Sequence, residues 1–407
     1  MEMHNWIKSL QMIALVTAVS FVDNSCQAVK TPIILVPGVG GSQVWLKWNE
    51  HNRESIFCRK ESDEFVKVWV DILKLVRGTT LPCSLHNLKL IYNTTTHFTQ
   101  NQVGVEAEIP GFGDTSTIES LTGIGIGDYF KNLVNTAVKW GYKRSVSIRG
   151  APYDWRRAPN ELSEYYNDLK RLIEETYYIN DNVSVTIIAH SLGCTNALYF
   201  FNHQTQEWKD KYIKQYVSMN GPYGGTVTAL KTYVSGYDFD ESPIIFPPLT
   251  LRGLERTLPS TAFMLPSDRF WFAQEVLVQS PSKKYTIADL DALYDDLKLP
   301  INAMMTADTK QLIYDLTPPG VETHCIYSNS IDTVEMMKYN SEFPNEAKPD
   351  ETYGDGDGVV NIRSLLACPK WAHKQPHDVT SKLFPKIKHF DVALNDDVID
   401  YIKQLVL

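Results

Sequence analysis

The sequence has no run of basic residues and no apolar run long enough to cross a bilayer. Its 407 residues carry a formal net charge of −9, so the chain lacks the cationic surface that nucleic acids require, and no nucleic acid partner is expected. The apolar segment near the start, residues 9–22, falls short of the ~20 residues that a transmembrane helix needs. With 43% hydrophobic residues, the chain can still bury a large core.

The first 28 residues have the pattern of a secretory signal peptide, with a membrane anchor as the alternative. Lys8 gives a weakly positive start, and residues 10–22 form an apolar centre. Cys26 and Ala28 are small residues at the positions that specify cleavage. We therefore expect cleavage after Ala28 and entry into the secretory pathway.

Cysteine is scarce, but its use fits an exported protein. Removal of the signal peptide would delete Cys26, and two glycosylation sequons begin at Asn93 and Asn182. Cys194 lies at the predicted start of a buried helix, where we expect a free thiol. The other four cysteines allow three pairings, which the sequence alone does not distinguish. They are Cys58, Cys83, Cys325 and Cys368.

Three motifs that would indicate a bound nucleotide or metal are incomplete. The glycine-rich turn at residues 37–42 lacks the dinucleotide fingerprint and the Lys-Ser/Thr pair of a phosphate-binding loop. The Gly-Asp-Gly-Asp-Gly segment at 354–358 lacks the next oxygen ligand of a calcium loop, because Val359 stands there. His373 and His377 are separated by a proline that prevents a zinc-binding helix. We therefore expect no cofactor and no metal.

The sequence does contain a strand, a tight turn and a helix around one serine. A β-branched apolar run, typical of a buried strand, leads into Ala-His-Ser-Leu-Gly at 189–193. This is a close variant of the Gly-x-Ser-x-Gly nucleophile elbow, whose small residues permit the sharp turn. An ordinary strand, turn and helix is the alternative. If Ser191 is a nucleophile, the N–H of Leu192 can stabilise the oxyanion, together with that of Val39 after the predicted strand 33–36.

An acid and a histidine follow the serine in the order that α/β-hydrolases use. Asp355 and Asp357 stand in a glycine-rich turn, and by chemistry both remain candidates for the acid. His389 comes just before the last predicted helix, residues 396–407, where this fold places its base. The order Ser191, acid, His389 differs from the orders of serine proteases. It predicts an α/β-hydrolase core whose serine attacks an ester carbonyl and forms an acyl-enzyme.

Three further segments allow functional interpretations. Residues 65–76, taken as a helix, are apolar on more than one face, which fits either a wide core helix or a patch that enters a lipid surface. In the aromatic and cationic loop 149–157, Trp155 either stacks on substrate while Asp154 holds an arginine, or packs structurally. Residues 226–318 lose the alternation of strands and helices, as a lid does.

Several motifs together resemble the lecithin:cholesterol acyltransferase family, and most closely its ceramide-acylating branch, the lysosomal phospholipases A. The resemblance covers essentially the whole chain after the signal peptide. Its most specific part is Arg-Gly-Ala-Pro-Tyr-Asp-Trp-Arg-Arg-Ala-Pro-Asn at 149–160. The other matching segments are 35–38, 110–113, 189–193, 208–213, 318–321, 354–358 and His389.

The resemblance implies site residues that the chemistry leaves open. It implies a triad that uses the second aspartate of the turn, two backbone oxyanion donors and two disulfides. These are Ser191, Asp357 and His389 for the triad, Val39 and Leu192 for the oxyanion, and Cys58–Cys83 and Cys325–Cys368 for the disulfides. The implied domains are a signal peptide at 1–28, a hydrolase core at 29–57, 93–225 and 319–407, a membrane-binding insertion at 58–92, and a cap with a lid at 226–318.

The resemblance also implies an activity. We expect a calcium-independent serine phospholipase A and O-acyltransferase, lysosomal or secreted, that works on a phospholipid membrane or lipoprotein surface. Its acyl acceptor would be water or a lipid alcohol. Alternatives are a neutral-lipid lipase of the same fold and a catalytically silent lipid-binding protein. Val39 departs from the lysosomal phospholipases A, which carry an acidic residue there, so a lysosomal pH optimum does not follow.

Overall fold

The computed structural model describes residues 30–49, 56–69, 81–122, 127–237, 248–345 and 348–407. The predicted signal peptide lies outside these residues, as do parts of the 65–76 segment and of the expected lid. Within the described ranges, no helix is long and apolar enough to cross a membrane.

A sheet of six parallel strands forms the centre of the fold. In the order of the sheet, they are β15 (Val379–Leu383), β12 (Thr323–Tyr327), β9 (Ile213–Met219), β8 (Val185–His190), β1 (Ile33–Val36) and β7 (Ile148–Gly150). The inner strands are continuous apolar runs because both faces of a parallel sheet are covered. In β1, Ile33 and Leu35 join the core on one face, while Ile34 and Val36 join the core on the other.

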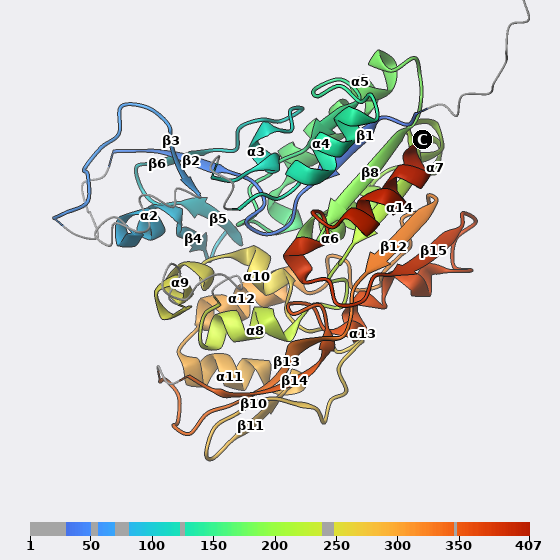
Figure 1. Ribbon diagram of the computed structural model, residues 1–407. Coiled ribbons are helices and arrows are strands. Elements are labelled where there is room, and N and C mark those ends of the chain that lie inside the picture. Colours follow the sequence, from blue (N-terminus) through green and yellow to red (C-terminus); the bar gives the residue numbers. More distant parts are fainter. Residues whose placement is uncertain (1–29, 50–55, 70–80, 123–126, 238–247, 346–347) are drawn as a thin grey trace, which may run out of the picture.

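Helices cover both faces of this sheet, as Figure 1 shows. One face carries the core shared with α4 (Lys131–Lys139) and α14 (Asp396–Val406). The other face carries the core shared with α5 (Ser163–Ile179), α6 (Leu192–Asn202) and α7 (Gln206–Tyr212). This three-layer arrangement around a parallel sheet is that of an α/β-hydrolase, and it confirms the predicted fold class.

A small antiparallel region lies at one end of the core, on the left in Figure 1. Residues 65–76, which we expected to be helical, include a strand instead, and those from 70 onward lie outside the described residues. The alternation of apolar and polar residues in Val-Lys-Val-Trp explains the strand. The elements are the sheet β3 (Val66–Trp69), β2 (Val44–Trp48) and β6 (Val105–Glu108), helix α2 (Leu81–Leu88), and the hairpin β4 (Leu90–Asn93) with β5 (Phe98–Asn101).

A cap with its own apolar core lies below the sheet in Figure 1. Its helices are α8 (Val227–Val234), α9 (Pro248–Glu255), α10 (Pro259–Phe263), α11 (Leu290–Leu297) and α12 (Pro300–Thr309). Its sheet has the order β11 (Lys284–Thr286), β10 (Val276–Gln279), β13 (Ile331–Lys338) and β14 (Asp350–Gly356). The last two strands come after β12, so the chain returns to the cap beyond residue 318.

Short helices connect these parts of the molecule. They are α3 (Ser116–Glu119), α13 (Ile362–Leu365), and the 3-10 turns η1 (Pro159–Glu161), η2 (Ile287–Asp289), η3 (Cys368–Trp371) and η4 (His389–Asp391).

Candidate active site

The turn between β8 and α6 places Ser191 in an unusual backbone conformation. Its φ of 55° and ψ of −129° lie in a region that residues other than glycine rarely adopt. A Cβ added at Gly193 would lie 2.5 Å from the carbonyl oxygen of Pro37, and one added at Gly38 would lie 2.6 Å from Cβ of Ser191. Glycine is therefore required at both positions for the chain to approach so closely.

The structure brings the predicted serine, histidine and aspartate into one hydrogen-bonded line. Nε2 of His389 lies 2.8 Å from Oγ of Ser191, and Nδ1 of His389 lies 2.7 Å from Oδ2 of Asp357. All three side chains are buried. The geometry is that of a nucleophile, a general base and an acid that orients the base.

Backbone contacts hold the acid in place at the end of β14. Oδ1 of Asp357 accepts hydrogen bonds from the N–H groups of Val359 and Val360, at 3.0 and 2.7 Å. The N–H of His389 donates to the backbone carbonyl of Asp357 at 2.9 Å. Asp355 is exposed and accepts from the N–H of Ser330 at 2.6 Å. The structure thus distinguishes two aspartates that the chemistry of the sequence left equivalent.

The two predicted oxyanion donors come from two different segments near the serine. Leu192 is the first residue of α6, so its N–H belongs to the positive end of a helix. Val39 lies in the turn after β1, which we call the oxyanion loop (residues 37–42). Val39, Ser191 and His389 line one pocket. This placement allows both N–H groups to serve an oxyanion formed at Ser191.

The pocket over the serine is mostly apolar and lies between the hydrolase core and the cap. The cap contributes Ala229 and Thr232 from α8, Glu255 from α9, and Met264 after α10. The apolar part of this lining suits the acyl chain of a substrate, and threonine hydroxyls and the carboxylate of Glu255 add polar groups to the wall. No local sequence pattern indicates these cap residues, because their approach to Ser191 depends on tertiary structure.

Comparison with known proteins identifies the family. The family described as Lecithin:cholesterol acyltransferase matches residues 65–396. The chain belongs to the lecithin:cholesterol acyltransferase family. It is 37% identical to the lysosomal phospholipase A and acyltransferase of Mus musculus and to that of Homo sapiens, over 92% of this chain and 90% of each relative. It is 34% identical to the phosphatidylcholine-sterol acyltransferase of Gallus gallus, over 90% of this chain and 87% of that protein. As a member of this family, the chain is an enzyme.

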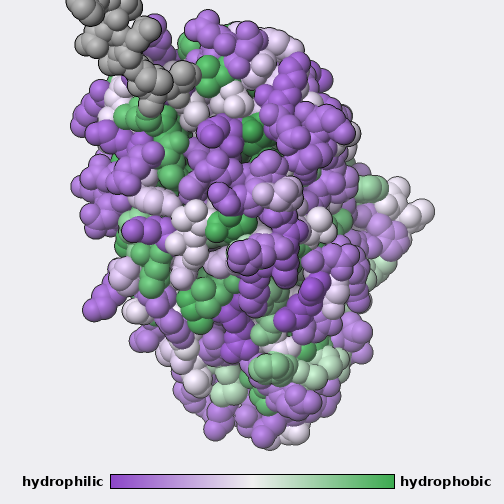
Figure 2. All heavy atoms as spheres, turned by 90° about the vertical axis from the view of Figure 1, so that its right-hand side faces the viewer, coloured by the Kyte–Doolittle hydropathy of each residue, from purple (hydrophilic) through white to green (hydrophobic). Residues whose placement is uncertain are grey.

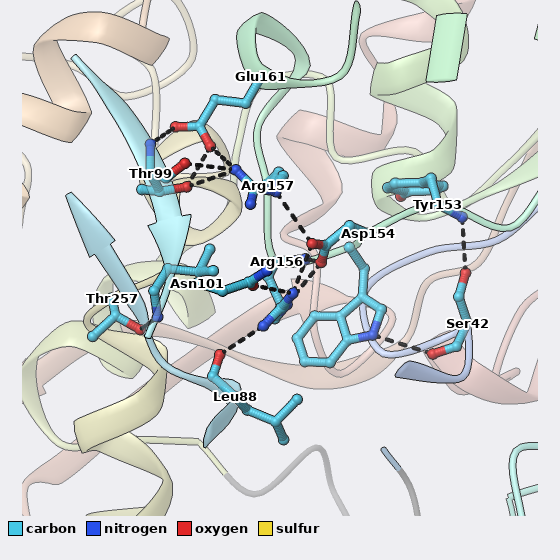
Figure 3. Close-up of polar contacts among 12 residues, drawn as sticks. Ser42, Leu88, Thr99, Asn101, Tyr153, Asp154, Arg156, Arg157, Glu161 and Thr257 are labelled. Carbon is cyan, nitrogen blue, oxygen red and sulfur yellow. Dashed lines mark hydrogen bonds and ion pairs between the residues drawn. The ribbon is translucent and has the colours of Figure 1, made fainter. Parts of the chain in front are cut away.

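Trp155, which we predicted to bind substrate, does not line the pocket around Ser191. Its side chain is fully buried, donates from Nε1 to the carbonyl oxygen of Ser42 at 3.2 Å, and lies 4.9 Å from the ring of Trp69. The N–H of Tyr153 donates to Oγ of Ser42 at 3.2 Å, as Figure 3 shows. Trp155 therefore lies beside the oxyanion loop and is hydrogen-bonded to it through Ser42.

Asp154 holds arginines, as predicted, but it also lies outside the pocket. It accepts hydrogen bonds from Nε of Arg156 at 2.8 Å and Nε of Arg157 at 3.2 Å. Burial alone would raise the pKa of Asp154, but the charge and hydrogen bonds of Arg156, joined by Arg157, lower that pKa below its ordinary value. Arg156 also donates hydrogen bonds to the carbonyl oxygen of Leu88 and to Oδ1 of Asn101, each at 3.0 Å (Figure 3). The network connects the 149–160 motif of this family to the antiparallel region.

The other residues singled out in the sequence are the cysteines and the two asparagines of the glycosylation sequons. The disulfides Cys58–Cys83 and Cys325–Cys368 are both present, with Cα atoms 5.5 and 5.8 Å apart. Cys194 is a buried free thiol, and burial raises its pKa to about 11. The predicted glycosylation sites Asn93 and Asn182 are both exposed.

Proposed function

We propose that this enzyme is a calcium-independent serine phospholipase A and O-acyltransferase. The observation that carries the proposal is the buried line from Asp357 through His389 to Ser191, which opens onto an apolar pocket. The names of its relatives, a lysosomal phospholipase A and acyltransferase and a phosphatidylcholine-sterol acyltransferase, support a phospholipid as the acyl donor.

The first half of the reaction acylates the serine. Nε2 of His389 accepts the hydroxyl proton of Ser191 while Oγ attacks the ester carbonyl of the phospholipid. Asp357 fixes the imidazole tautomer and stabilises the imidazolium. The N–H groups of Val39 and Leu192 stabilise the oxyanion. The tetrahedral intermediate collapses when His389 returns the proton to the leaving oxygen, which releases a lysophospholipid.

The second half transfers the acyl group. Water or a lipid alcohol enters the pocket and loses its proton to His389 as its oxygen attacks the acyl-serine. The same N–H groups stabilise the second oxyanion, and Ser191 regains its proton from the imidazolium. The products are a free fatty acid or an acylated lipid alcohol.

The surroundings of the two carboxylates in residues 354–358 support the proposed calcium independence. Both oxygens of Asp357 are engaged by His389 and by backbone N–H groups, and Asp355 accepts from Ser330. Protein groups supply the nucleophile, the base and the oxyanion donors, so no step requires a cation. Hydrolysis should therefore be unchanged when EDTA replaces calcium in the assay.

A lipid surface is the proposed site of action, within the lysosome or outside the cell. Ile56 and Phe57 are 81% and 75% exposed beside the disulfide of Cys58. Exposed apolar side chains on a tethered loop can enter the headgroup region of a bilayer. The face with α14, β12 and β15, shown in Figure 2, is predominantly hydrophilic, with apolar residues in small separate groups.

Replacement of the nucleophile tests the proposed function. Ser191→Ala should abolish fatty-acid release from phosphatidylcholine vesicles and labelling by a fluorophosphonate probe, because both need the serine oxygen. Release near the wild-type rate would overturn the serine mechanism. In parallel assays, the enzyme should hydrolyse phosphatidylcholine faster than triglyceride. The opposite preference would indicate a neutral-lipid lipase. Mass spectrometry of the products with water, ceramide or cholesterol present would identify the acceptor.

A further inference from the structure

We infer that Tyr129 and His190 are positioning residues that hold the oxyanion loop, the nucleophile and the base in one arrangement. The inference rests on the proposed function, since it concerns how the groups of the same serine site are held in their relative positions. Neither side chain contacts substrate in this account, and neither is part of the line from Asp357 to Ser191.

Three hydrogen bonds join the segments that carry the chemistry. The N–H of Gly38, in the oxyanion loop, lies 2.9 Å from the hydroxyl of Tyr129. That hydroxyl is hydrogen-bonded to Nδ1 of His190, the residue before the nucleophile. Nε2 of His190 lies 2.9 Å from the carbonyl oxygen of His389. All of these groups are buried, so water does not compete for them.

The chemistry of each group fixes the direction of every bond in the chain. The carbonyl oxygen of His389 can only accept, so Nε2 of His190 must carry the proton. In a neutral imidazole Nδ1 is then an acceptor, and the hydroxyl of Tyr129 must donate to it. The N–H of Gly38 can only donate, and it uses a lone pair of the same hydroxyl. This single set of proton positions therefore gives every polar group of the three hydrogen bonds a partner.

The surroundings of His190 favour this neutral tautomer. Burial lowers the pKa of His190 well below its ordinary value, and the neighbouring charge of His389 lowers it further, against a raising effect of the bond to the His389 carbonyl. A protonated His190 would have no acceptor for the hydroxyl of Tyr129. Because His389 becomes cationic during the reaction, a neutral neighbour also avoids repulsion at that stage.

Packing makes the contact between Tyr129 and the oxyanion loop close. A Cβ added at Gly38 would lie 3.1 Å from the hydroxyl of Tyr129, and one added at Gly41 would lie 3.0 Å from its Cε1. The rings of His190 and His389 lie 4.8 Å apart. The Tyr129 ring thus packs against the oxyanion loop. Its hydroxyl, through the bond to Gly38, holds the position of the loop that presents the N–H of Val39. The two contributions can be separated by experiment.

Removal of the hydroxyl tests the inference. Tyr129→Phe should lower kcat on p-nitrophenyl butyrate by about 10- to 100-fold, because sub-ångström misplacement of the oxyanion loop weakens transition-state stabilisation. KM should stay within about twofold, since the pocket is intact. The concentration of active enzyme is measured by complete labelling of its serine with a fluorophosphonate, and kcat is calculated from that concentration. Unfolded protein is thereby excluded from the calculation.

Tyr142→Phe is the matched control. Tyr142 is also buried, and its hydroxyl donates to the carbonyl oxygens of Thr31 and Val406 at 2.9 and 3.0 Å, away from the site. This variant should lose stability without losing kcat. If Tyr129→Phe also keeps kcat within twofold of wild type, the inference is overturned.

Substitutions of His190 give an independent test should Tyr129→Phe fail to fold. Gln at position 190 keeps an N–H that reaches the carbonyl of His389, whereas Ala removes it. His190→Gln should therefore lose less kcat than His190→Ala, and wild-type kcat in His190→Ala would overturn the inference. Ser191→Ala is assayed beside them. Turnover by that variant would refute the proposed function itself, while an inactive Ser191→Ala with fully active Tyr129→Phe would refute only the positioning role.

Discussion

Asp355 and Asp357 have different surroundings although only one residue separates them. Asp357 points into the protein toward His389, while Asp355 lies at the surface and caps the N–H of Ser330. Two carboxylates of the same type, separated by one glycine, thus have unlike surroundings. The backbone hydrogen bonds from Val359 and Val360 single out the buried one.

Substitution of the two aspartates should separate their roles. Asp357→Asn should lower kcat by about 10⁴-fold, because an amide cannot hold the imidazole tautomer that accepts the serine proton. Asp355→Asn, the matched control, should remain within twofold of wild type. Steady-state kinetics on a soluble ester decides between them. Equal losses in both variants would contradict the assignment of the acid.

The pH dependence of stability should report on His190. Burial lowers its pKa in the folded chain, so the unfolded chain binds a proton near pH 6.5 that the folded chain does not. Stability is therefore complete above about pH 6.5 and falls as the pH drops toward the folded pKa, by up to about 1.4 kcal/mol per pH unit. Thermal unfolding of His190→Asn should show a flatter decline between pH 7 and 5. An unchanged slope would contradict a neutral buried His190.

At the scale of elements, the acid depends on a hairpin of the cap rather than on the central sheet. After β12 the chain leaves the core, forms β13 and β14 in the cap sheet, and delivers Asp357 directly after Gly356. The disulfide Cys325–Cys368 encloses this excursion. The cap therefore positions Asp357, the proposed catalytic acid, as well as part of the pocket wall.

The sequence predicted the elements whose pattern is local. The predicted strand 33–36 and the β-branched run before residue 189 match β1 and β8, and the predicted helix 396–407 matches α14. The serine was recognisable because the elbow compresses strand, turn and helix into a few residues. By contrast, β13 and β14 are of mixed polarity without a regular alternation. The part of 65–76 in β3 suits either a strand or a helix. The positioning contacts of Tyr129 join segments far apart in the chain, so no local pattern indicates them.

The buried arginine network should be a principal support of the antiparallel region. Arg156 is 0% exposed and bonds Asp154, Leu88 and Asn101. Arg156→Met should lower the free energy of unfolding by about 3–5 kcal/mol, since it leaves a buried carboxylate poorly compensated.

An exposed ion pair provides the control for Arg156. The side chain of Arg171 is 74% exposed and pairs with Asp168 on α5. Arg171→Met should change the free energy of unfolding by no more than about 1 kcal/mol. Urea denaturation of both variants tests the difference. Similar small effects would show that the network around Arg156 is not a major source of stability.

At the scale of the whole molecule, three parts meet at one serine. The core supplies Ser191 and His389, and the cap supplies Asp357 and part of the apolar pocket. The family motif at 149–160 joins the oxyanion loop to the antiparallel region. The same antiparallel region exposes Ile56 and Phe57. The proposed lipid contact therefore lies in the same antiparallel region that Arg156 joins to the 149–160 motif.

Loss of the exposed apolar pair should weaken action on membranes but leave the chemistry intact. Ile56→Ser with Phe57→Ser should weaken binding to phosphatidylcholine vesicles by at least about tenfold, because two large apolar side chains no longer enter the bilayer. Turnover of a soluble ester should not change. Leu383→Ser in β15, at a side chain 39% exposed on the hydrophilic face, is the control and should bind normally. Wild-type vesicle binding by the double variant would contradict the proposed lipid contact.

The covalent intermediate gives the most direct test of the central claim. The enzyme is mixed with phosphatidylcholine, quenched with acid within its first turnovers, digested, and examined by mass spectrometry. We expect a fatty-acyl mass on the peptide that contains Ser191, and we expect it to disappear when a lipid alcohol is added before the quench. Release of fatty acid with no acyl group ever present on Ser191 would contradict the central claim.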